Sequence, residues 1–178
     1  MTSTNETAFD PTTEVLLAER VGTYLRASED GRGVRVGLAC GRFNGGVTTR
    51  LLDAALEALL EKGVERRDIV LGWAPGAFEL PLLAKAMITS GRVDAVLTLG
   101  AVIRGDTGHY DVVAGECARG VQDVQLATGT PVIFGVLTTN TVDQALERSM
   151  PDHTNKGRET ALTALEMVNI VKRGPLGA

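Results

Sequence analysis

A histidine that follows a run of small residues is the most chemically suggestive feature of this sequence. His109 comes after Arg104–Gly108, which in turn follow the apolar run Asp94–Ile103. A run this rich in Val, Leu and Ile is typical of a strand buried on both faces. We therefore predict a strand over Asp94–Ile103 and a loop at its carboxyl end, where open parallel sheets bind ligands. The imidazole of His109 titrates near neutral pH and could transfer a proton; the alternative is a surface histidine that starts a helix.

The loop itself could bind an anion. Gly105, Asp106, Thr107 and Gly108 can present backbone N–H groups at the N-terminus of the helix predicted over His109–Thr128. An inward-pointing Asp106 would repel a phosphate, so Asp106 could instead cap the helix, as could Thr107. The loop has neither the GxGxxG nor the GxxxxGK[ST] spacing, which excludes a dinucleotide fingerprint and a Walker loop.

Four further side chains are candidates, each with a structural alternative. Phe43 in the GRFNGG segment either covers the local core or offers a platform to a flat ring. Glu79 lies near the start of a helix, where an acid is favoured by the helix dipole alone. Arg148 ends a predicted helix, where a cation is favoured by the helix dipole alone. His153 lies in a polar loop and is interpreted as a solvated residue.

Strands and helices alternate four times after Val34, with short connections. The predicted strands are Val34–Cys40, Ile69–Trp73, Asp94–Ile103 and Pro131–Leu137, and the predicted helices are Val47–Lys62, Ala77–Ser90, His109–Thr128, a segment capped by Asn140 or Thr141 that runs through Arg148, and Arg158–Arg173. This alternation predicts an α/β fold, a three-layer α/β/α sandwich with a four-stranded parallel sheet. Right-handed crossovers bring the loops after all four strands to one edge of that sheet.

The N-terminal part is less regular. Residues 1–13 are polar and are predicted to be a disordered tail, and residues 14–178 a single domain. Glu14–Leu17 and Val21–Leu25 are partly alternating segments that could each form a strand, and Ser28–Gly33 is predicted to be a turn.

Composition limits the possible partners. The net charge is −4 with dispersed basic residues, which argues against nucleic-acid binding and against a polybasic membrane patch. No apolar run approaches the roughly 20 residues that span a bilayer, and the N-terminus has no pattern of a secretory signal. Cys40 and Cys117 are expected to be buried free thiols rather than a disulfide. Because only two histidines are available, and no Cys/His spacing resembles a zinc site, we do not expect a structural metal. We expect a cytoplasmic protein.

Five motifs, in order and with matching spacing, resemble the 6,7-dimethyl-8-ribityllumazine synthase family from about Val34 to the C-terminus. They are GRFN at Gly41–Asn44, PGAFELP at Pro75–Pro81, LGAVIRGDTGHYD at Leu99–Asp111, TPVIFGVLTTNTVDQALER at Thr130–Arg148 and NKGRETALTALEM at Asn155–Met167.

The resemblance implies a flavodoxin-like fold and the penultimate step of riboflavin biosynthesis. In that step 5-amino-6-(D-ribitylamino)uracil condenses with 3,4-dihydroxy-2-butanone 4-phosphate, with release of phosphate and water. It implies a transferase that needs no metal or redox cofactor and passes its product to riboflavin synthase.

The resemblance also assigns roles to residues by position. His109 matches the proton-transfer residue, and Asp106, Thr107 and Arg148 match residues that bind the butanone phosphate. The residues that would bind the pyrimidine and its ribityl chain are Phe43, Ala77, Phe78, Glu79, Ala101, Val102, Ile103, Phe134 and Lys156. Of all these, Phe134, Arg148 and Lys156 match residues that a neighbouring subunit supplies.

The family implied by the resemblance forms pentamers, sometimes packed into icosahedral capsids. In such an assembly Glu14–Leu17 would pair with a neighbour's sheet, and each site would be shared between subunits. Two alternatives remain open. A binding module for lumazine or flavin would need neither His109 nor Arg148, and a flavodoxin-like electron carrier would need a Ser/Thr-rich phosphate loop that GRFNGG does not supply.

Overall fold

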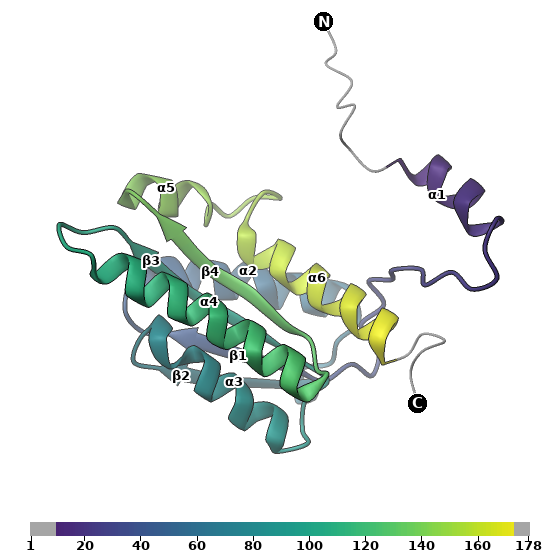
Figure 1. The fold of residues 1–178 in the computed structure, drawn as a ribbon, viewed down its shortest axis with the longest axis horizontal. Coiled ribbons are helices and arrows are strands. Elements are labelled where there is room, and N and C mark those ends of the chain that lie inside the picture. Colours follow the sequence, from purple (N-terminus) through teal and green to yellow (C-terminus); the bar gives the residue numbers. More distant parts are fainter. Residues whose placement is uncertain (1–9, 173–178) are drawn as a thin grey trace, which may run out of the picture.

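Four parallel strands form the centre of the structure, in the order β2-β1-β3-β4 (Figure 1). They are β1 (Val36–Gly41), β2 (Ile69–Ala74), β3 (Ala95–Ile103) and β4 (Val132–Thr139). The structure is a computed structural model and describes residues 10–172. Every neighbouring pair of strands is parallel, and helices flank the sheet, which confirms the predicted α/β/α architecture.

The two central strands are buried over almost their entire length. All six residues of β1 are buried, and of β3 only Ile103 is partly exposed. The register pairs Val36 of β1 with Ala95 of β3 on one side and with Ile69 of β2 on the other. Burial on both faces explains why the two segments contain no charged residue.

Helices cover the two faces of the sheet in pairs (Figure 1). Next to one face lie α2 (Gly45–Glu61) and α6 (Lys156–Val171), with a core that includes Leu51, Leu97 and Leu165. Next to the other lie α3 (Leu80–Thr89) and α4 (His109–Thr128), with a core that includes Leu80 and Val96. Each fully buried Leu or Val contributes roughly 1.5–3 kcal/mol relative to exposure. The fold therefore rests on two separate apolar layers.

The remaining elements are short, and helix ends differ slightly from the sequence prediction. They are α1 (Pro11–Ala18), α5 (Val142–Glu147) and the 3-10 turns η1 (Arg66–Asp68) and η2 (Ala77–Glu79). The segment predicted as one helix from Ala77 begins with η2 and continues as α3, with Pro81 in the first turn of α3 as expected. The N-cap of α5 is Thr141, whose Oγ1 accepts the N–H of Gln144 at 3.2 Å.

The last helix begins two residues earlier than predicted. The Oδ1 atom of the buried Asn155 accepts the N–H of Gly157 at 2.8 Å, and this cap allows α6 to begin at Lys156 rather than at Arg158. The predicted last residue of this helix, Arg173, lies outside the described residues.

Neither N-terminal segment that could form a strand does so in this single chain. Glu14–Leu17 lies in a helix, α1 (Pro11–Ala18), and Val21–Leu25 has no regular structure. The reason is a strong helix start, because the carboxylate of Asp10 accepts the N–H groups of Thr12 and Thr13 at 3.0 and 3.2 Å. Pro11 occupies the first turn, where its lack of an N–H costs nothing. Of the predicted disordered tail, residues 1–9 lie outside the described part, and Pro11–Thr13 belong to α1.

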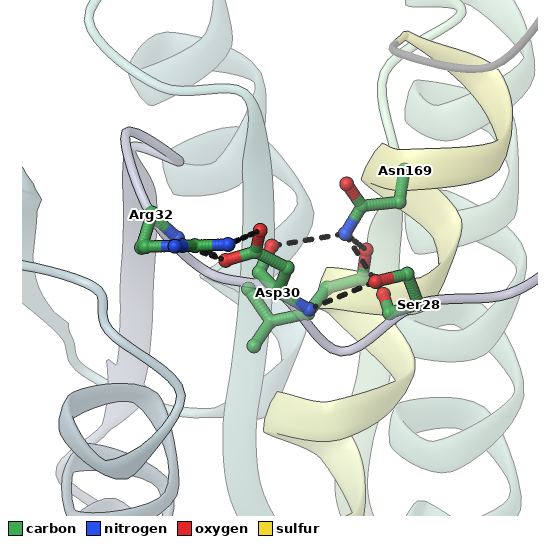
Figure 2. A network of polar contacts seen from close by, with 5 residues as sticks. Ser28, Asp30, Arg32 and Asn169 are labelled. Carbon is green, nitrogen blue, oxygen red and sulfur yellow. Dashed lines mark hydrogen bonds and ion pairs between the residues drawn. The ribbon is translucent and has the colours of Figure 1, made fainter.

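A polar network fastens the segment between α1 and the sheet. Figure 2 shows the side-chain nitrogen of Asn169, on α6, donating to the carbonyl oxygens of Ser28 and Asp30 at 2.8 and 3.0 Å. The carboxylate of Asp30 in turn accepts two bonds from the guanidinium of Arg32. The chain therefore enters β1 from a fixed point on α6, while α1 lies away from the sheet and its helices (Figure 1).

A second polar contact joins the starts of the two central strands. The Arg35 guanidinium binds the Asp94 carboxylate at 2.8 and 3.1 Å. Burial raises the pKa of Asp94, but the hydrogen bonds from Arg35 outweigh it and leave this pKa below its usual value. The pair therefore stabilises the fold at neutral pH, and the contribution is lost as the pH falls through the lowered pKa.

Both cysteines are free and buried, as predicted. Cys40 lies in the core beside α2 and α6, and Cys117 in the core beside α3 and α4, so the sheet separates them. Burial raises the pKa of Cys40 to about 12 and that of Cys117 to about 11. Both groups remain neutral thiols at physiological pH. No helix within residues 10–172 is long and apolar enough to cross a bilayer.

Helices α2 and α6 approach each other closely at Gly157. A Cβ atom on this residue would lie 1.9 Å from the carbonyl oxygen of Leu51, a distance at which backbone atoms would have to move. Gly115, in the interior of α4, is the opposite case, because a Cβ there would meet no atom within 4 Å.

These two glycines give a matched pair of variants. We expect Gly157→Ala to lower the free energy of unfolding by about 1–3 kcal/mol or more, because it overpacks a helix contact. Gly115→Ala should leave it unchanged or raise it by up to ~1 kcal/mol, because alanine favours the helix. Urea unfolding of both variants measures the difference, and equal free energies would contradict the close approach.

Candidate active site

A cavity of about 680 Å³ lies at the carboxyl edge of the sheet. Its walls come from the end of β3, from the loops that follow β1, β2 and β3, and from the first turns of α4. The lining residues are Phe43, Asn44, Pro75–Glu79, Ala101–Ile103, Gly105, Thr107, His109, Tyr110, Val112 and Val113. Three of the four predicted loops thus meet; the loop after β4 does not line this cavity.

The loop after β1 is shaped by Asn44. Its backbone adopts a left-handed conformation, with φ of 57°, which asparagine tolerates better than most residues. Its side-chain nitrogen donates to the carbonyl oxygen of Ala101 at 2.9 Å, and the N–H of Phe43 donates to the carbonyl of Pro75 at 3.1 Å. Both bonds hold the turn against neighbouring strand ends. The Phe43 side chain, 74% exposed, consequently stands at the cavity rather than covering the core.

The loop after β2 brings a carboxylate to the same cavity. The Oε2 atom of Glu79 accepts the N–H of Gly76 at 3.1 Å, which fixes the side chain beside the start of α3. Within residues 10–172 no group donates a hydrogen bond to its other oxygen. Phe78 is about half exposed, and Ala77 is buried below it. The cavity thus has an aromatic ring and an anchored hydrogen-bond acceptor on one side.

The end of β3 and the start of α4 form the opposite side. Ala101, Val102 and Ile103 give an apolar wall. His109 is the first residue of α4, and its N–H donates to Thr107 Oγ1 at 3.4 Å. The N-cap is Gly108, so the interpretation of Asp106 as the helix cap is wrong; its exposed side chain does not line the cavity.

Sequence reasoning missed six lining residues, which are Asn44, Pro75, Gly76, Tyr110, Val112 and Val113. Asn44 lies within the quoted GRFN motif, and an asparagine before a helix was the available signal. Val112 and Val113 follow His109 by three and four positions, the spacing that places side chains on one face of a helix. Tyr110 lines the cavity as well. The helical periodicity of α4, continued from His109, would have identified both valines.

Three predicted residues lie away from this cavity. Phe134 is on the edge strand β4 and is 38% exposed. Arg148 ends α5, where its Nη1 donates to the carbonyl of Gln144 at 3.0 Å, and Lys156 forms an ion pair with Glu159. Arg148 and Lys156 are neighbours, because the Lys156 N–H donates to the Arg148 carbonyl at 3.0 Å. His153 lines a different, solvent-open cleft beside α2.

The groups that line the cavity can bind an organic substrate. Within residues 10–172, no three His, Cys, Asp or Glu side chains are grouped closely enough to hold a metal. An imidazole, a carboxylate, a hydroxyl and the N–H groups at the start of α4 face a mainly apolar cavity with an aromatic ring. Such a set can stack a flat ring, bind hydroxyl groups and an anion, and transfer protons.

A comparison with protein families supports this chemistry. The family model described as 6,7-dimethyl-8-ribityllumazine synthase matches residues 33–172. Of the elements described within residues 10–172, the match includes all four strands and five of the six α-helices, together with every residue that lines the cavity. It begins where the chain enters β1, after α1.

Proposed function

The chain belongs to the 6,7-dimethyl-8-ribityllumazine synthase family of riboflavin biosynthesis, and we propose that it catalyses the condensation of 5-amino-6-(D-ribitylamino)uracil with 3,4-dihydroxy-2-butanone 4-phosphate. The products are 6,7-dimethyl-8-ribityllumazine, phosphate and water. One observation carries the proposal: His109 faces the same cavity as Phe43 and Glu79. A proton-transfer group, an aromatic platform and a hydroxyl acceptor are the groups that this condensation needs.

The pyrimidine substrate is assigned to the side of the cavity formed by the first two loops. Its ring stacks on Phe43 and lies along Ala101, Val102 and Ile103. Its ribityl chain extends past Ala77 and Phe78, and its hydroxyl groups donate to the carboxylate of Glu79. The bond that Glu79 accepts from Gly76 supports this assignment, because it holds the carboxylate in place before substrate arrives.

The butanone phosphate is assigned to the start of α4. There its phosphate accepts hydrogen bonds from the backbone N–H groups of Asp106–Gly108 and from the Thr107 hydroxyl. These donors lie at the positive end of a 20-residue helix. Asp106 contributes through its backbone in this arrangement, since its side chain does not line the cavity. Arg148 of a neighbouring subunit supplies the balancing positive charge.

His109 moves the protons of the reaction. The 5-amino group attacks the ketone and a first water leaves to form an imine. Phosphate is then eliminated to leave an enol that tautomerises to a ketone, and the ribitylamino nitrogen closes the new ring on that carbonyl with loss of a second water. Each stage adds or removes a proton at an atom near the boundary between the two substrates, where the imidazole of His109 would act as general acid and base. Orienting two intrinsically reactive molecules supplies much of the remaining acceleration. The reaction uses no metal or redox cofactor.

The complete site requires a homo-oligomer, a pentamer or a capsid of pentamers. Phe134, Arg148 and Lys156 are exposed and lie outside their own chain's cavity, which supports their use by a neighbour. The edge strand β2 exposes Leu71 and Trp73, and an N-terminal segment of another copy could pair with it. In one chain that segment is the helix α1, so strand addition would require α1 to unfold. The lumazine would pass to riboflavin synthase in the cytoplasm.

The simplest test mixes both substrates with the protein and follows the fluorescence of the lumazine. We expect product with wild-type protein, and a rate roughly 10- to 100-fold lower with His109→Ala, because a general acid–base group is lost while orientation is kept. Absence of product from folded wild-type protein would refute the enzyme and leave a module that only binds lumazine or flavin. Complete inactivity of folded His109→Ala would show that orientation contributes little.

A second variant tests the phosphate site. Arg148→Ala should raise the KM for the butanone phosphate about 10- to 100-fold, the effect expected when a charge-assisted hydrogen bond is lost. The KM for the pyrimidine should change much less. Steady-state kinetics with each substrate varied in turn give both values. Equal increases in the two KM values would argue against a phosphate role for Arg148.

Mixed oligomers test whether the site is shared. Subunits carrying His109→Ala and subunits carrying Arg148→Ala are unfolded together, refolded and compared with each variant alone. If adjacent subunits share a site, some interfaces in the mixture combine an intact His109 with an intact Arg148 from the neighbour. We expect activity above that of either variant. No gain in oligomers shown by mass spectrometry to be mixed would contradict a shared site.

A further inference from the structure

The loop between β3 and α4 has almost no packing of its own. All of Gly105–Gly108 is exposed, and a Cβ atom on Gly105 or Gly108 would meet no atom within 4 Å. Inside the loop and its helix junction, the bonds are those from the N–H of His109 to Thr107 Oγ1 and from the N–H of Asp111 to the Gly108 carbonyl. The position of the loop must therefore be fixed by the residues on either side of it.

Arg104 and Asp111 flank the loop and bind each other across its base. Nη2 of Arg104 lies 2.9 Å from Oδ1 of Asp111, and Nη1 lies 3.2 Å from Oδ2. This two-bond pairing connects the last residue before the loop with the first turn of α4. Together with the backbone between Arg104 and Asp111, it makes a closed loop that contains Thr107 and His109.

The same guanidinium reaches two further groups. Its Nε donates to Oδ1 of Asn140 at 3.1 Å, in the loop after β4, and the backbone N–H of Asn140 is bonded to Gln144 on α5. Its central carbon also lies 4.0 Å from the centroid of the Tyr110 ring, a cation–π contact. One side chain thus joins the end of β3, the loop after β4 and the start of α4.

This combination requires arginine. A planar guanidinium can bind a carboxylate with two N–H groups, donate through Nε and stack on an aromatic face at the same time, whereas an ammonium cannot. Hydrogen bonding to Asp111 raises the pKa of Arg104 further above neutrality, so the group remains charged. Neither Arg104 nor Asp111 lines the cavity, so both act without touching a substrate.

We propose that Arg104, through Asp111, Asn140 and Tyr110, is the positioning residue that holds the Gly105–Gly108 loop and His109 toward the cavity. The link to substrate rests on the proposed function: with the loop fixed, its N–H groups and the Thr107 hydroxyl bind the phosphate of the butanone substrate. Without Arg104 the loop keeps its N–H groups and the Thr107 hydroxyl, but their positions relative to the phosphate are no longer fixed.

The test compares Arg104→Gln, Arg104→Lys and Asp111→Asn with Arg119→Gln. Arg119 is a matched control, because it is also an exposed arginine that binds two carboxylates, Glu116 and Asp123, but lies farther along α4. We expect Arg104→Gln to raise the KM for the butanone phosphate roughly 10- to 100-fold, the scale of a small misplacement of binding groups. The KM for the pyrimidine should change much less, Arg104→Lys should restore only part of the loss, and Arg119→Gln should behave as wild type.

Hydrogen exchange provides a measurement that is independent of activity. The backbone amides of Arg104, His109 and Asp111 donate hydrogen bonds at the two ends of the loop. They should exchange faster in Arg104→Gln and Asp111→Asn than in wild type or Arg119→Gln, while the amides of β1 and β3 remain protected. Exchange rates equal to wild type would overturn the proposal, as would faster exchange with an unchanged KM. If wild-type protein forms no lumazine, the proposed function fails, and the exchange rates still decide whether Arg104 holds the loop.

Discussion

Parallel strand pairing is the constraint on which the rest of this structure depends. A parallel strand can continue into its neighbour only through a crossover, so every strand ends at the same edge and a loop leads away from it. Here the loops after β1 and β2 are joined by the Phe43–Pro75 bond, and the loop after β1 is joined to β3 by the Asn44–Ala101 bond. The cavity is the space that these joined loops leave above the sheet.

Because the central strands are buried, the groups that could bind a ligand lie at the strand ends. β1 and β3 carry no charged side chain, so Glu79, Thr107 and His109 all lie on the loops or at the helix starts that follow strands. Glu79 and Thr107 each accept a short-range bond from a backbone N–H, that of Gly76 and that of His109 respectively. The rigid sheet thus supports a site whose polar groups remain close to water.

On the side of the molecule near β4, a buried polar residue fixes the position of the chain. Asn155 is buried, accepts the N–H of Gly157 and donates to the carbonyl of Met150 at 2.8 Å. That fixes where α6 begins and, with the close contact of Gly157 to Leu51, how α6 lies on α2. Lys156 and Arg148 are consequently presented outward from a rigid frame. In the proposed oligomer, these exposed cations would complete the site of an adjacent subunit.

The sequence by itself determined the layered fold, because apolar periodicity and length distinguish buried strands from amphipathic helices. It also indicated most of the cavity, since Phe43, Glu79, Thr107 and His109 each follow a predicted strand. It misassigned Glu14–Leu17, where the helix cap at Asp10 outweighed an alternating pattern. Only the tertiary structure decided which side chains meet across loops, such as Asn44 with Ala101 and Arg104 with Asp111 and Asn140. Such contacts depend on backbone directions and distances in space, which residue types and their spacing do not specify.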